Sequence, residues 1–162
     1  MPTRVPLRGK DAKAILTDLK SKFQLDEGIF GSKPLVEKTQ LRNGELILIN
    51  GKPVLLKRQS QLIPTLKFDY LVGKLARLVV DMGAVPHICN GADVMARGVR
   101  SIEGEFMKGA LVAIVDETHR KQIAIAEALA DSASIREMKS GKAASNLHFV
   151  GDEAWDAMKS NG

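Results

Sequence analysis

The stretch from Leu78 to Val99 constrains the fold of this chain most, because signals for a strand, a helix, a second strand and a turn follow one another within it. It opens with Leu78-Val79-Val80, a short apolar run rich in β-branched residues that is typical of a buried strand. Asp81 comes next, and its carboxylate can accept a hydrogen bond from a free backbone N–H in the first turn of a helix. We therefore predict a strand that leads directly into a capped helix.

The predicted helix covers residues 83–89. Pro86 is compatible with it because, counted from the capping aspartate, it falls in about the first turn, where N–H groups have no partner within the helix. Asn90-Gly91 ends the helix, since both residues tolerate the left-handed conformation. Residues 93–95 then begin a second strand, which Gly98 ends at a turn. The predicted unit is a strand, one tight helix, a strand and a glycine loop.

This unit resembles the opening of a PUA domain, the RNA-binding module of pseudouridine synthases and archaeosine transglycosylases. Residues 80–99 carry the resemblance. The later signals occur in the same order: Lys108-Gly109 precedes an apolar strand, and the run at 140–144 (Ser-Gly-Lys-Ala-Ala) precedes Asn146-Leu147-His148. These motifs are short and depend on glycine, so their order carries more weight than any one of them.

The first half of the chain extends the resemblance to nearly the whole length. Residues 63–67 (Ile-Pro-Thr-Leu-Lys) and 151–155 (Gly-Asp-Glu-Ala-Trp) match small two-domain proteins similar to the malignant-T-cell-amplified-sequence protein and the N-terminal part of ligatin. This implies an α+β fold of two domains. A small basic pre-PUA-like α+β domain would span residues 1–75, and a PUA-like mixed-strand pseudo-barrel with two short helices would span residues 76–162.

Local patterns in the first half agree with an α+β chain. Residues 8–23 are predicted to form a helix, because apolar residues recur there at spacings of three and four. Asn50-Gly51 between the apolar runs 45–49 and 53–57 is the strongest hairpin signal, since a type I′ turn needs positive φ at both central residues. Pro53 lacks an N–H, so its strand is expected to lie at a sheet edge there.

The two halves are joined by a short apolar connection near Ala76 rather than a Gly/Ser-rich linker, so we expect packed domains. Before it, residues 59–64 are expected to be a loop, and Asp69 is expected to cap a short helix. After it we predict, in order, a strand at 110–115, a strand at 122–129, a helical turn or two at 134–139, a strand at 147–150, and a last turn capped by Asp152 that carries Trp155 in the core.

Composition restricts the class of protein. The hydrophobic share of 44% is ordinary for a folded protein. No run of about 18 apolar residues occurs that could span a membrane, and the first residues lack the apolar stretch of a signal peptide. Cys89 is the single cysteine, which excludes an internal disulfide and suits a reducing compartment. We therefore expect a cytoplasmic protein without a membrane partner.

Positive charge is concentrated in the first half. Residues 1–76 hold 14 Lys and Arg against 7 Asp and Glu, a net charge of +7, whereas residues 77–162 hold 10 against 12, a net charge of −2. Such an excess suits binding to a polyanion, or is simply a solvated basic surface. If RNA is bound, we infer that both halves touch it. The candidate contacts in the first half are Lys10, Lys13, Lys20, Lys57, Arg58 and Lys67.

The sequence contains no catalytic or metal-binding constellation. His87, His119 and His148 fall in three separate elements, and Cys89 is only two residues from His87, so that pair points to different faces of the predicted helix. Neither a Gly-x-Ser-x-Gly elbow nor a phosphate-binding glycine loop is present. Asp81 is better explained as a helix cap than as a catalytic carboxylate. We therefore expect no enzymatic activity, no metal and no cofactor.

Ala96-Arg97-Gly98-Val99-Arg100 is the best local candidate for a binding site. Glycine lets a backbone approach a sugar or phosphate closely, and Arg97 and Arg100 can pair with phosphate oxygens. A plain turn with two solvated arginines fits the same residues. The resemblance favours binding, because PUA domains use this loop, the end of the preceding helix and the last strand as their RNA groove.

Carried over by position, the resemblance implicates residues on both walls of that groove. Family members often have proline where this chain has Arg97, a departure that affects the shape of the loop and adds a cation. The implicated residues are Gly91, Val94, Met95, Arg97, Gly98 and Val99 on one wall and Lys139, Gly141, Lys142 and Ala143 on the other.

The resemblance implies a non-catalytic RNA-binding protein of translation that recognises tRNA acceptor ends or small-subunit rRNA. It also implies the small ribosomal subunit and a protein with an initiation-factor-like domain as partners.

The alternative is an RNA-recognition subunit of a modifying enzyme of the pseudouridine synthase or archaeosine transglycosylase type. An enzyme with its site between the halves would need a perturbed carboxylate or histidine in a cleft. The aromatic share of 4% argues against a sequence-specific single-strand reader.

Overall fold

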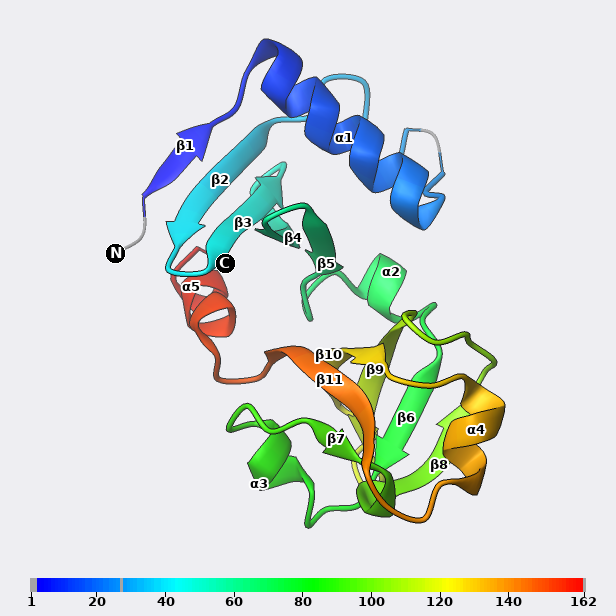
Figure 1. Ribbon diagram of the computed structural model, residues 1–162. Coiled ribbons are helices and arrows are strands. Elements are labelled where there is room, and N and C mark those ends of the chain that lie inside the picture. Colours follow the sequence, from blue (N-terminus) through cyan, green and yellow to red (C-terminus); the bar gives the residue numbers. More distant parts are fainter. Residues whose placement is uncertain (1–2, 27, 162) are drawn as a thin grey trace.

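Two β-sheets joined by a common hydrophobic core form the frame of the protein (Figure 1). The structure is a computed structural model that describes residues 3–26 and 28–161. Residues 1–2, 27 and 162 of the two predicted domains lie outside the described part. The first sheet is antiparallel, and its strands lie in the order of the sequence. They are β1 (Arg4–Pro6), β2 (Val36–Leu41), β3 (Gly44–Ile49), β4 (Lys52–Arg58) and β5 (Gln61–Pro64).

The first sheet is buried on both faces because its central strands alternate two sets of apolar residues. Ile47 and Ile49 pack with the apolar stripe of helix α1 (Gly9–Phe23), which crosses one face as the sequence pattern predicts. Leu46 and Leu48 point to the opposite face and join the core that the two sheets share. The period of two in β3 therefore determines which side faces the second half of the chain.

The hairpin at Asn50-Gly51 is confirmed, with φ of 54° and 82° at the two residues. β4 as a whole is an interior strand, because it lies between β3 and β5. At Pro53 itself, however, β5 is not paired with β4, since Leu55 is the last residue of β4 that pairs with it, so the predicted edge exists only at this position, beside a β-bulge in the β3 pairing.

Two expectations in this half are wrong. The segment 59–64 is not a loop, because β5 pairs with β4 after a tight turn. Gln59 has φ of 56° in that turn, and no Gly or Asn marks the position in the sequence. Asp69 does not cap the short helix α2 (Asp69–Val72). It is the first residue inside the helix, and no side-chain cap bond forms there.

The second sheet curls into a half-barrel with strand order β7-β11-β10-β9-β6-β8 (Figure 1). β6 lies between β9, to which it is parallel, and β8, to which it is antiparallel. The helices of the half-barrel are short, as predicted. The elements are β6 (Arg77–Val80), α3 (Val85–Ile88), β7 (Val94–Met95), the 3-10 turn η1 (Ala96–Gly98), β8 (Val99–Glu103), β9 (Leu111–Asp116), β10 (Gln122–Ala128), α4 (Ser132–Glu137) and β11 (Lys142–Phe149).

Helix α5 (Glu153–Asn161) returns from the second sheet to the first (Figure 1). Its Ala157 and Met158 pack with Leu56 of β4 in the shared core, which also includes Ile125 of β10. The carboxylate of Glu153 accepts hydrogen bonds from the backbone N–H of Arg42 at 3.0 Å. The two sheets are thus held by one core. The division of the chain near residue 76 stays a prediction.

A buried histidine ties the halves together. His148 at the end of β11 is fully buried, and its Nε2 accepts a hydrogen bond from the backbone N–H of Leu66 at 3.1 Å. Nδ1 therefore carries the proton and donates to Oδ2 of Asp152 at 2.9 Å. Asp152 also accepts from the N–H groups of Phe149 and Trp155, so it caps α5 as predicted. Trp155 is half-buried at the margin of the core.

The charge state of Asp152 follows from these contacts. Burial alone raises the pKa of this carboxyl, but the hydrogen bonds from His148 and the two backbone N–H groups hold it below its ordinary value.

No helix in the described ranges is both long and apolar enough to cross a membrane.

We expect His148→Leu to lower the free energy of unfolding by about 1–3 kcal/mol, because the buried N–H of Leu66 loses its acceptor. Urea unfolding followed by circular dichroism measures the change. His119→Leu is the matched control, since His119 lies in an exposed turn, and it should change stability by less than about 0.5 kcal/mol. Equal effects of the two substitutions would contradict the role given to His148.

Asp152→Asn should change how stability depends on pH. A depressed folded-state pKa contributes stability that is present above the unfolded value of about 3.9 and is lost as the pH falls through the folded value. The wild-type chain should therefore exceed the variant most near neutral pH, and the gap should narrow below about pH 4. Unfolding free energies measured across this range test the expectation, and a gap that does not vary with pH would contradict it.

Candidate nucleic-acid interface

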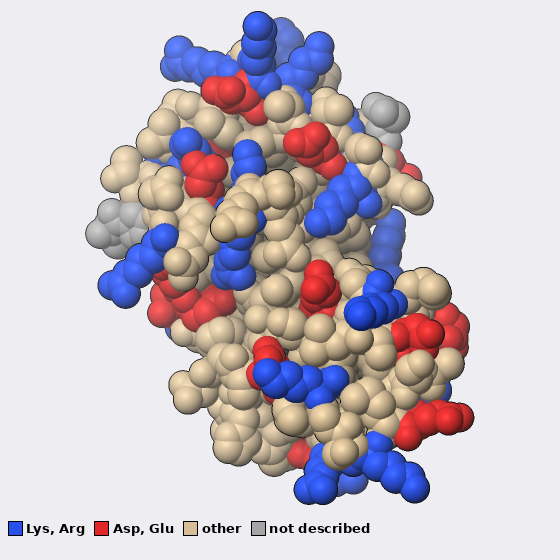
Figure 2. Space-filling model, viewed as in Figure 1, with Lys and Arg blue, Asp and Glu red and all other residues tan. Residues whose placement is uncertain are grey.

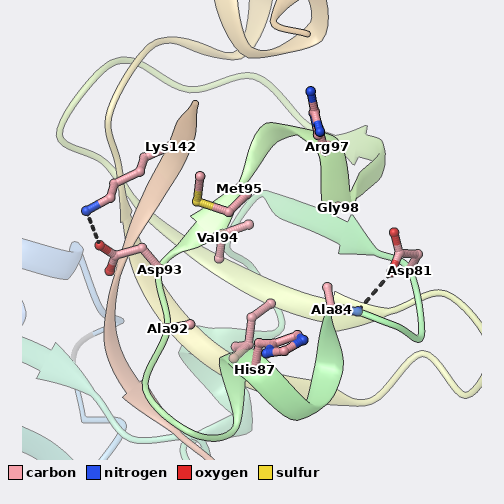
Figure 3. A pocket seen from close by; sticks show the side chains of 11 residues that line it. Asp81, Ala84, His87, Ala92, Asp93, Val94, Met95, Arg97, Gly98 and Lys142 are labelled. Carbon is pink, nitrogen blue, oxygen red and sulfur yellow. Dashed lines mark hydrogen bonds and ion pairs between the residues drawn. The ribbon is translucent and has the colours of Figure 1, made fainter. Parts of the chain in front are cut away.

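A cavity of about 450 Å³ opens beside α3, β7 and η1, where the sequence predicted a groove (Figure 3). Its floor is apolar, because Ile88 and Val94 are buried there against the interior of the half-barrel. Charged side chains stand around the opening. The lining residues are Asp81, Ala84, His87, Ile88, Ala92, Asp93, Val94, Met95, Arg97, Gly98 and Lys142.

The glycine turn lies close to helix α3 because Gly98 has no side chain. A Cβ at this position would lie 3.2 Å from the Cβ of Ala84, a tight contact. The carbonyl of Gly98 accepts a hydrogen bond from the N–H of Asp81 at 2.9 Å. The Oδ1 of Asp81 in turn accepts from the N–H of Ala84 at 2.8 Å (Figure 3). Asp81 thus closes the turn that leads into α3 and is not its N-cap, because the helix begins at Val85 with Ala84 in the cap position and no side-chain cap bond.

The opposite wall is fixed by Asn146 of β11. Its side-chain amide donates to the carbonyls of Ile88 and Ala92 at 3.0 and 2.9 Å, and its backbone N–H donates to Asp93 at 2.9 Å. Lys142 reaches the other oxygen of Asp93 at 3.2 Å (Figure 3). The N–H of Asn146, and then Lys142, hold the pKa of Asp93 below its ordinary value. Asp93 is therefore a charged link between β11 and the α3–β7 loop.

The two arginines of the glycine loop behave differently. Arg97 is exposed, extends outward from the rim of the cavity, and has no carboxylate partner among the residues that the structure describes (Figure 3). Arg100 lies outside the cavity, 3.9 Å from Asp81 and 3.7 Å from Glu117. Arg97 is thus available to an anionic ligand, whereas Arg100 neutralises two carboxylates of the protein itself.

The structure brings only part of the predicted set to the cavity. Ala143 is fully buried in a small core, and Val99 packs inward. Two glycines shape the walls from behind. Gly91 has φ of 96°, and the carbonyl of Gly141 accepts a hydrogen bond from the N–H of Ala96 at 2.8 Å. The predicted residues that line the cavity are Val94, Met95, Arg97, Gly98 and Lys142, and those that do not are Gly91, Val99, Arg100, Lys139, Gly141 and Ala143.

Several lining residues were missed by sequence reasoning. His87 was considered only as a metal ligand, Asp81 was considered as a helix cap or a catalytic carboxylate, and Asp93 was assigned to a strand. The available signal was the helix itself, because Ala84, His87 and Ile88 are spaced by three and four residues and so share one face. No group of three or more His, Cys, Asp or Glu side chains in the described ranges is placed to hold a metal ion.

The basic residues of the first half do not form one patch with the cavity. Lys10 and Lys13 are exposed on α1, where Figure 2 shows lysine and arginine gathered at the top of the molecule. Lys57 lines a separate polar cleft, and Lys67 lies 5.7 Å from the ring of Trp155. Arg58 donates to the carbonyl of Leu147, so it serves the contact between the halves. Lys20 is half-buried on α1.

Curated relatives cover most of the chain. A protein of Methanocaldococcus jannaschii is 37% identical over 153 residues, 93% of this chain and 93% of that protein. The Malignant T-cell-amplified sequence 1 homolog of Dictyostelium discoideum is 27% identical and matches 88% of this chain and 82% of its own length. Translation machinery-associated protein 20 of Saccharomyces cerevisiae is 26% identical, over 69% of this chain and 66% of its own length.

Solved structures and family matches agree with these relatives. A hypothetical protein of Pyrococcus horikoshii OT3 superposes with a TM-score of 0.76 at 33% identity, over 96% of this chain and 99% of that one. A conserved PUA domain protein of Thermoplasma acidophilum gives 0.72 at 29% identity, over 96% and 99%. Residues 76–150 match the PUA domain, an RNA-binding module, and residues 3–69 match DUF1947, a domain of unknown function. The chain therefore belongs to the two-domain family that joins an N-terminal DUF1947 domain in the pre-PUA position to a C-terminal PUA domain.

Proposed function

We propose that this protein is a non-catalytic RNA-binding factor of translation and that its PUA cavity recognises an RNA end, either a tRNA acceptor end or an exposed segment of small-subunit rRNA. The observation that carries the proposal is the cavity itself. It combines a glycine turn, an apolar floor and two cationic side chains, Arg97 and Lys142, at its rim. The name of the yeast relative, Translation machinery-associated protein 20, supports an association with translation.

The chemistry of the cavity suits one unstacked nucleotide. The buried side chains of Ile88 and Val94 and the exposed thioether of Met95 offer apolar contact to a base. Arg97 and Lys142 can pair with phosphate oxygens, with Lys142 exchanging Asp93 for the phosphate. His87 and Asp93 supply hydrogen-bonding groups near the base edge. Recognition would rest on groove shape and backbone contacts, and affinity on the cations.

The first half of the chain would add affinity through its positive charge. A net charge of +7 over residues 1–76 favours association with a polyanion. Lys10 and Lys13 are exposed on α1, where an RNA backbone could reach them. The partners we propose are tRNA or rRNA on the small ribosomal subunit, together with a protein that carries an initiation-factor-like domain.

We expect Gly98→Trp to abolish the preference for a tRNA with an intact 3′ end over a trimmed one, because the indole fills the cavity. Arg97→Ala with Lys142→Ala should weaken binding roughly tenfold or more and lower the slope of log K against log salt by about two. Fluorescence anisotropy across a salt series measures both.

Lys121→Ala controls for the loss of one positive charge outside the cavity, since Lys121 is exposed in the β9–β10 turn and is not among the residues that line the cavity. It should retain the preference for the intact end. If wild type, Gly98→Trp and trimmed RNA all bind alike, the cavity does not recognise RNA ends and the proposal fails.

Charge reversal on α1 tests the contribution of the first half. Lys10→Glu with Lys13→Glu should weaken binding to every RNA by a similar factor, about tenfold at low salt, while leaving the ratio between intact and trimmed tRNA unchanged. Competition assays at two salt concentrations measure this ratio. Wild-type affinity in the reversed variant would show that α1 does not approach the RNA.

A further inference from the structure

A second cavity, of about 340 Å³, lies in the DUF1947 domain and shares no lining residue with the PUA cavity. It is enclosed by the loop that follows α1, the β3–β4 turn and the segment between β5 and α2. Its inner wall is apolar, because Ile49, Pro53 and Val54 are buried there while Phe30 and Phe68 are half-buried. The cavity therefore opens directly onto the core beneath α1.

Three of the seven aromatic residues of the chain form one row at this cavity. The ring centroids of Phe30 and Phe68, and of Phe68 and Tyr70, are 6.1 Å apart with an angle of 29° between the planes. The row is held from its end, since the Tyr70 hydroxyl donates to Asp26 at 2.6 Å and the ammonium of Lys74 lies 3.9 Å from the Tyr70 ring. The wall of the cavity is thus preformed.

The cavity offers a ligand little hydrogen bonding. The Asn50 amide already donates to the carbonyl of Phe30 at 3.0 Å and accepts from the N–H of Leu35 at 3.0 Å. The Tyr70 hydroxyl is committed to Asp26. A nucleobase would find its edges unpaired and a central ring, Phe68, already stacked between two others. An aliphatic or aromatic side chain has no such requirement.

The rim is basic. Lys52 and Lys67 are the only charged residues among those that line the cavity in the described part of the chain, and both are exposed. The backbone N–H of Leu35 donates to Asn50 beside the opening. The side chain of Leu35, which is 51% exposed, extends the apolar surface outward. An apolar hollow with lysines at its edge is complementary to a bulky apolar side chain flanked by carboxylates.

We propose that this cavity binds a bulky apolar side chain presented by an acidic segment of a partner protein. The side chain enters against Phe30 and Val54, and neighbouring Asp or Glu residues pair with Lys52 and Lys67. This site is separate from the RNA groove and does not depend on the proposed function. It gives the DUF1947 domain a role as a protein-docking module.

The test is NMR titration of the full chain with synthetic peptides of about nine residues, the length of a short linear motif. A peptide with a central Leu, Phe or Trp flanked by Asp and Glu should shift the amide signals of residues 29–30, 49–52, 54 and 67–70. Replacing the central residue by Ala, or the acidic flanks by Lys, should weaken binding about tenfold or more. If no acidic peptide shifts these signals, the proposal is overturned.

Two variants sharpen the result. The double variant Lys52→Glu, Lys67→Glu should bind the acidic peptide about tenfold more weakly than wild type. The double variant Lys10→Glu, Lys13→Glu makes the same change of charge on α1 and should bind the peptide with wild-type affinity. Gly98→Trp should also bind the peptide normally, which separates this site from the RNA groove. If single-stranded oligouridylate shifts the cavity signals and the peptides do not, the site binds nucleotides and the proposal is wrong.

Discussion

The two hydrogen bonds of the His148 ring hold together parts of the molecule that are far apart in the sequence. One ring nitrogen accepts from Leu66, at the end of the first sheet, and the other donates to Asp152, which begins helix α5. The His148 ring and the N–H of Leu66 are buried, where a polar group left without a hydrogen bond would cost free energy. The direction of β11, the start of α5 and the approach of the first sheet are therefore mutually dependent.

The sequence predicted the elements best where a local rule decides the backbone. The hairpin at Asn50-Gly51, the helix cap at Asp152 and the periodic helix at 8–23 each follow from a few adjacent residues. Asp81 was placed correctly next to α3, but it closes the turn before the helix rather than capping it. β5 was missed because its partner strand, rather than its turn, stabilises it. Pro53 indicated a sheet edge only for its own position, because β5 is too short to pair there, and it gave no sign that the rest of β4 is interior.

The candidate site was predictable in position but less so in membership. Motif order located the glycine turn and the final strand, and these do border the cavity. Sequence position alone cannot say which of two nearby arginines finds a carboxylate: Arg100 does, at Asp81 and Glu117, while Arg97 has none among the residues that the structure describes. Nor does it show that Ala143 faces the core, since alternation along β11 is interrupted near residue 143, where the register shifts.

Helix α5 has a consequence for the order in which the protein can assemble during synthesis. The first sheet is made early, yet one of its faces, with Leu46, Leu48 and Leu56, is covered by Met158 and its neighbours from the other end of the chain. Until residues 153–161 leave the ribosome, that face exposes apolar surface and its strands lack their final cover. The first half therefore cannot complete this face of its core on its own, because the residues that cover it are made last among the described elements.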